Sequence, residues 1–117
     1  MKLTAAVLPS DVIRKIVNHK KEWILSGSDP IRIILFGSAA SDNMTTASDV
    51  DLILIYQNST NLKEVSRELF KKRPKDDWPQ DVLFYTEETF QKSCDKGGGI
   101  CWLANQDGKV IYEKESQ

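Results

Sequence analysis

Two short stretches decide how this chain folds: Leu35-Phe36-Gly37-Ser38 and Ser48-Asp49-Val50-Asp51-Leu52. The first ends an almost wholly apolar run that begins at Ile31, and such a run is typical of a strand buried on both faces. The second opens another apolar run, which continues to Tyr56 and predicts a second strand. The end of one buried strand therefore carries a Gly-Ser turn, and the start of the other carries two carboxylates.

The pair Asp49 and Asp51 is the most unusual feature of the sequence. Side chains two positions apart on a strand point to the same face, with Cα atoms about 6.5 to 7 Å apart. Two carboxylates at the edge of an apolar core repel each other and are costly to desolvate unless a cation neutralises them. Asp81 opens a third apolar run, which ends at Tyr85, and would add a third carboxylate if its strand lay beside the first two.

Three carboxylates at one end of a sheet can hold Mg²⁺, which prefers a few carboxylates together with water and substrate phosphates. Such a site supports phosphoryl or nucleotidyl transfer, and Asp81 could also accept the proton of an attacking hydroxyl. Gly37 and Ser38 supply the complementary part, because a glycine lets the backbone approach a phosphate and a serine hydroxyl can hydrogen-bond it. The plainer interpretations are a simple strand-to-helix turn, a solvated strand edge and, for Asp81, the end of a loop.

The remaining sequence alternates between helical and strand patterns, which predicts an α/β or α+β domain around a small mixed β-sheet flanked by helices. Ser10 is expected to cap the first helix, and Thr86 is expected to cap the third. Gly97-Gly98-Gly99 is interpreted as a loop. The expected helices are about 10–25, 62–70 and a third after Thr86, and the expected strands are 31–36, 49–56, 81–85 and 109–112.

Composition limits the functional classes. The chain has 117 residues, enough for a single domain over 1–117, and its net charge of -1 provides no general attraction for nucleic acid or an anionic membrane. With two cysteines and one histidine, neither a zinc site nor a disulfide framework is expected, so Cys94 and Cys101 are interpreted as small buried thiols. No apolar run reaches the length of a membrane span, and a cytoplasmic protein is expected.

The motif Leu35-Phe36-Gly37-Ser38, followed after about ten residues by Ser48-Asp49-Val50-Asp51-Leu52, resembles the signature of the minimal nucleotidyltransferases, the MNT branch of the DNA polymerase beta superfamily. The run 81–85 is similar to the family's third-carboxylate strand. Residues 107–113 are similar to its closing segment. The resemblance covers the catalytic core at about 31–113.

This resemblance implies a nucleotidyltransferase fold in which Gly37 and Ser38 hold the phosphates of a nucleoside triphosphate. Asp49 and Asp51 would bind Mg²⁺ or Mn²⁺, while Asp81 would assist metal binding and act as the base on the acceptor. The donor implied is ATP, and the product is AMP attached to an acceptor hydroxyl. Many short members are similar in being antitoxins of helical HEPN-domain toxins, some of which are inactivated by AMP on a tyrosine.

The family pattern often has Arg two positions after the glycine, and a further Arg and Gly soon after, whereas this chain has Ala39, Ser41 and Asp42. The alternative hypothesis is therefore a catalytically weak or inactive module that neutralises a partner by binding alone. A third hypothesis is that the protein modifies a small molecule, as the aminoglycoside nucleotidyltransferases do, or that it is a subunit whose partner chain binds the acceptor. Homo- and hetero-oligomers both stay open.

Overall fold

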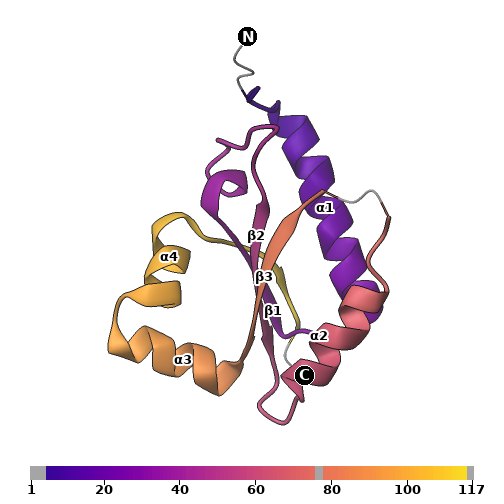
Figure 1. The fold of residues 1–117 in the computed structure, drawn as a ribbon. Helices are drawn as coiled ribbons and strands as arrows, with labels where there is room; N and C mark the ends of the chain where they lie inside the picture. Colours follow the sequence, from indigo (N-terminus) through magenta and orange to yellow (C-terminus); the bar gives the residue numbers. More distant parts are fainter. Residues whose placement is uncertain (1–4, 76–77, 116–117) are drawn as a thin grey trace.

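The computed structural model describes residues 5–75 and 78–115, which form a mixed four-stranded sheet with helices on both faces (Figure 1). Along the chain the elements are α1 (Ser10–Gly27), β1 (Arg32–Phe36), the 3₁₀ turn η1 (Gly37–Ala39), β2 (Val50–Tyr56), α2 (Leu62–Lys71), β3 (Gln80–Thr86), α3 (Glu87–Lys96), α4 (Gly99–Asp107) and β4 (Lys109–Glu113). The sheet order is β3-β2-β1-β4. Strand β1 is antiparallel to β2 and β4, whereas β2 and β3 are parallel.

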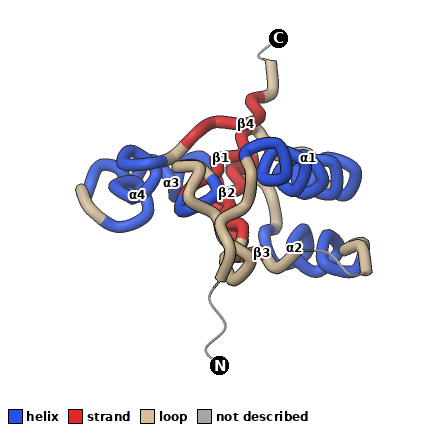
Figure 2. The backbone as a smooth tube through the Cα atoms, turned by 90° about the horizontal axis from the view of Figure 1, so that it is seen from above, coloured by secondary structure: helices blue, strands red, loops and turns tan. Residues whose placement is uncertain are grey.

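The helices form two layers, with α1 and α2 on one face of the sheet and α3 and α4 on the other (Figure 2). The alternation of side chains along β2 sorts its residues between these layers. Leu52 and Leu54 pack in the cluster that contains the apolar face of α1, while Ile53 and Ile55 pack against side chains of α3 and α4. Strand β2 is thus buried on both faces, which explains its almost continuous apolar sequence.

Helix α1 presents residues spaced three and four apart to the larger core, and Trp23 anchors it to α2 by donating from Nε1 to the carbonyl oxygen of Leu69 at 2.9 Å. Helix α3 begins at the expected cap: the Thr86 side chain accepts from the Thr89 amide, and the Thr89 hydroxyl accepts from the Thr86 amide. Within the described ranges, no helix is both long enough and apolar enough to cross a membrane.

The four predicted strands and three predicted helices are present, and most of their bounds agree within a residue or two. The prediction that Ser10 caps the first helix was wrong. Pro9 occupies the cap position, and the Ser10 hydroxyl instead donates to Asp42 Oδ2 at 2.6 Å. The prediction of a loop at Gly97-Gly98-Gly99 was wrong at its last residue, since Gly99 begins α4, a helix that was not predicted.

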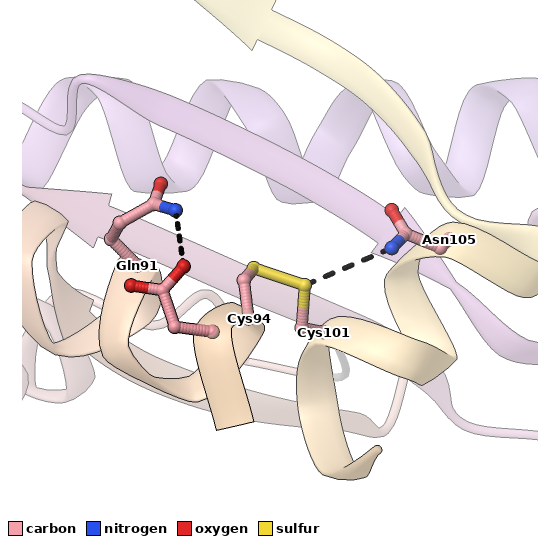
Figure 3. The surroundings of a disulfide bond; sticks show 5 residues. Gln91, Cys94, Cys101 and Asn105 are labelled. Carbon is pink, nitrogen blue, oxygen red and sulfur yellow. Dashed lines mark hydrogen bonds between the residues drawn. A yellow bond between two sulfur atoms is a disulfide. The ribbon is translucent and has the colours of Figure 1, made fainter. Parts of the chain in front are cut away.

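The interpretation of Cys94 and Cys101 as separate buried thiols was wrong, because they form a disulfide between α3 and α4 (Figure 3). The intervening Gly97, Gly98 and Gly99 have φ values of 72°, 71° and 64°, a left-handed conformation that glycine adopts without steric penalty. These glycines turn the chain back on itself, and the two cysteine Cα atoms lie 4.8 Å apart. Disulfides persist mainly in oxidising compartments, so this bond gives no support to a cytoplasmic location, which stays a prediction.

Candidate active site

The strand pairing brings two of the predicted carboxylates together. Asp51 of β2 and Asp81 of β3 are register partners on neighbouring parallel strands, so their side chains leave the sheet on the same face. This is the face of Ile53 and Ile55, which α3 and α4 cover. Figure 1 shows β2 and β3 starting at the upper end of the sheet, near η1, whereas α3 begins at the opposite end.

Asp49 immediately precedes β2 and is exposed, as is Asp81, whereas Asp51 is partly buried. Burial raises the pKa of Asp51, and the negative charges of Asp81 and then Asp49 raise it further. The three carboxylates therefore interact electrostatically, and the least exposed of them carries the largest cost of being charged. A cation bound beside them would relieve both the repulsion and the desolvation.

Gly37 places bare backbone directly against the Asp51 carboxylate. Its φ is 72°, and a Cβ atom added there would lie 2.3 Å from Asp51 Oδ2 and 3.2 Å from its Cγ. Only glycine fits this position without displacing the carboxylate. Gly37 and Ser38 belong to a single 3₁₀ turn, η1, in which the Ala40 amide donates to the Gly37 carbonyl oxygen at 3.1 Å.

The side chains of residues 39–42 offer no positive charge to a phosphate. Ala39 is buried in the core, whereas Ser41 and Asp42 are exposed. Asp42 has a φ of 61°, and its carboxylate accepts the hydrogen bond from Ser10. A triphosphate bound at Gly37 would therefore depend on backbone N–H groups, the Ser38 hydroxyl and a metal ion rather than on an arginine in this segment.

Among the described residues, no three Asp, Glu, His or Cys side chains are close enough to form a ready-made metal cage. The donor set nonetheless fits Mg²⁺ or Mn²⁺, because these ions prefer oxygen ligands and complete their coordination with water and substrate phosphates. Asp49 and Asp51 would hold such an ion, with Asp81 beside them on the neighbouring strand. An ion held here would share its coordination with water and substrate phosphates.

Sequence reasoning made no prediction for Lys20, yet its side chain reaches the start of β3. The Lys20 ammonium donates to the carbonyl oxygen of Trp78 and to Gln80 Oε1. The signal that could have revealed it is its place in the apolar stripe of α1, three residues after Val17 and four before Ile24. A lysine at such a position is buried and must have partners.

The polymerase beta nucleotidyltransferase family model matches residues 13–117. The chain therefore belongs to this nucleotidyltransferase family, and the resemblance of its motifs is confirmed. The structure is similar to the crystal structure of a proposed nucleotidyltransferase from Sulfolobus solfataricus, with 14% sequence identity, a TM-score of 0.57, and coverage of 90% of this chain and 84% of the other. At this identity the likeness shows the fold alone. No curated protein matches the chain.

Proposed function

We propose that this protein is a Mg²⁺-dependent or Mn²⁺-dependent nucleotidyltransferase that transfers AMP from ATP to a hydroxyl of a partner protein. The observation that carries the proposal is the contact of the Gly37 backbone with the Asp51 carboxylate, with Asp81 in register beside it. The turn that would bind phosphate and the carboxylate that would bind the metal therefore lie next to each other. Membership of the nucleotidyltransferase family supports the same reaction class.

Each group has a role in the proposed reaction. Gly37 and Ser38 hold the phosphates, and Asp49 and Asp51 hold the metal, which supplies charge neutralisation at the reacting phosphate. Asp81 accepts the proton of the acceptor hydroxyl. The acceptor oxygen then bonds to the α-phosphorus, the bond from this phosphorus to the leaving oxygen breaks, and pyrophosphate departs.

We further propose that the acceptor belongs to a HEPN-type toxin and that this protein acts as its antitoxin in the cytoplasm. The support is the resemblance of the motifs to antitoxins of this kind.

The test is transfer of label from ATP carrying a labelled α-phosphate. The protein is incubated with this ATP, Mg²⁺ and the product of its neighbouring gene, and the neighbour is expected to become labelled. The Asp49→Asn, Asp51→Asn double variant should transfer no label. A control that removes two exposed carboxylates elsewhere, Asp11→Asn with Asp95→Asn, should label as the wild type does. Equal labelling by the wild type and the Asp49, Asp51 variant would exclude the catalytic role.

The second candidate function is neutralisation of the partner by binding alone. It is favoured by the buried Ala39 and the exposed Asp42, which leave the segment after Gly37 without a cation for phosphate. In this case the Asp49→Asn, Asp51→Asn variant would still suppress toxicity in cells. Calorimetry would then detect no binding of ATP to the wild type.

A further inference from the structure

Lys20 is a fully buried lysine on α1, with 0% of its surface exposed. An ammonium in a protein core loses its hydration, so its hydrogen-bonding needs must be met by protein groups. Two of its contacts are to the segment that leads into β3, the carbonyl oxygen of Trp78 and Gln80 Oε1. Gln80 is the residue directly before Asp81, so Lys20 is hydrogen-bonded to the immediate neighbour of the candidate catalytic aspartate.

The same segment is also bonded to the start of β2. Trp78 Nε1 donates to the carbonyl oxygen of Ser48 at 2.8 Å, and the Val50 amide donates to the carbonyl oxygen of Pro79 at 2.9 Å. Ser48 and Val50 flank Asp49. The starts of β2 and β3, the two strands that carry the carboxylates, are therefore hydrogen-bonded to each other, and Lys20 links the start of β3 to α1.

This attachment matters because β2 and β3 are parallel. A hairpin turn fixes the register of antiparallel neighbours, but here the connection runs through α2 and a following loop, which do not fix it. A shift of one residue would move Asp81 to the opposite face of the sheet from Asp51. The contacts of residues 78–80 are thus placed where they can hold the two carboxylates on one face.

We propose that Lys20 is a positioning residue for nucleotidyl transfer, which holds the start of β3 through Trp78 and Gln80 so that Asp81 stays beside Asp51. The proposal rests on the proposed function for its catalytic consequence, whereas its structural part can be measured without any activity. In the proposed reaction, Gly37, Ser38, Asp49 and Asp51 bind ATP and its metal, whereas Asp81 assists metal binding and accepts the proton of the acceptor hydroxyl. Misplacing Asp81 should therefore slow the chemical step more than it weakens ATP binding.

The test is the variant Lys20→Met, which keeps the length of the side chain and removes its donors. Hydrogen exchange measured by NMR should accelerate by about tenfold or more at the Val50 amide and the Trp78 indole N–H, because the bonds they make join the two strand entries. The Lys114 amide, which donates to Ile31 at 2.8 Å beyond β4, should exchange as in the wild type. Lys15→Met, at an exposed position of α1, is the matched control and should change neither.

In the transfer assay, Lys20→Met should lower kcat by roughly a hundredfold, the effect of misplacing a reacting group by about 1 Å, and leave the KM for ATP within about twofold. Unchanged exchange at Val50 and Trp78, or an acceleration that is equally large at Lys114, would overturn the positioning role. If the wild type transfers no AMP, the proposed function fails while the exchange result still decides the structural claim.

If Lys20→Met does not fold, Gln80→Met provides a second test, because it removes the side-chain oxygen to which Lys20 donates and leaves Lys20 in place. It should also accelerate exchange at Val50. Wild-type exchange in this variant would contradict the proposal.

Discussion

Substitution of Gly37 by alanine is expected to damage activity far more than stability. The new Cβ would lie 2.3 Å from Asp51 Oδ2, and a normal contact begins near 3.4 Å, so the carboxylate must retreat by about 1 Å. The short Asp51 side chain can rotate away, which keeps the steric cost of the variant small. The stability cost is then mainly that of holding an alanine at a φ of 72°, about 1 kcal/mol.

The rate of AMP transfer is more sensitive than the stability of the fold to such a movement of the Asp51 carboxylate. A reacting group displaced by about 1 Å loses on the order of a hundredfold in rate, which corresponds to about 2.7 kcal/mol in the activation barrier. Gly37→Ala should therefore lower the melting temperature by only about 4 °C and lower AMP transfer by roughly a hundredfold.

Gly97→Ala is the matched control for this prediction. Gly97 has the same φ of 72°, and no heavy atom lies within 4 Å of the position its Cβ would take. It should also lose stability in thermal unfolding, because alanine is strained at this positive φ, but it should keep wild-type transfer activity. Equal activity of the two variants would refute the claim that the Gly37 backbone and the Asp51 carboxylate form one site.

Three further predictions concern other parts of the molecule. Because the pKa of Asp51 is raised in the folded protein, ionisation of this carboxyl reduces stability as the pH rises through that pKa. Asp51→Asn should therefore melt at a higher temperature than the wild type at pH 7 without divalent cations. Thermal scans at decreasing pH should show this difference disappearing below the ordinary aspartate pKa range. Replacing Cys94 and Cys101 by serine should lower the free energy of unfolding in urea by about 2 kcal/mol, because the bridge closes a short loop, and dithiothreitol should lower the wild type equally and leave the variant unaffected. Burial raises the pKa of Tyr56 to about 12, so ultraviolet titration of the wild type should show one tyrosine that ionises near this pH and is missing in Tyr56→Phe.

The strands were predicted correctly, and the candidate site residues could be selected from the sequence, because both have strong local signals. Strand β2 is apolar at almost every position, which follows from its burial on both faces. The Gly37-Ser38 motif and the Asp49, Asp51 pair stand at strand ends, where polar residues in an apolar run are conspicuous. Asp81 was found by the same criterion, and the parallel pairing of β2 with β3 then placed it beside Asp51.

The features that were missed depend on contacts between distant residues or on weak local patterns. Helix α4 is short, begins at the third of three consecutive glycines and has Cys101 as its only buried side chain among those described, so it shows little amphipathic period. The disulfide depends on the α3–α4 turn, which the sequence did not reveal. The role of Lys20 requires knowing that residue 78, far along the chain, returns to α1.

The most direct measurement locates the metal and nucleotide on the protein, independently of any acceptor. Mn²⁺ is titrated into the isotopically labelled protein together with a non-hydrolysable ATP analogue, and the line broadening of backbone amides is followed by NMR. The amides of Gly37, Ser38, Asp51 and Asp81 should broaden first, and the Asp49→Asn, Asp51→Asn variant should abolish the effect. Broadening that begins instead at the acidic groove around Glu64 and Glu68, which lies at the other end of β2, or no broadening at all, would contradict a metal and nucleotide site at these strand ends.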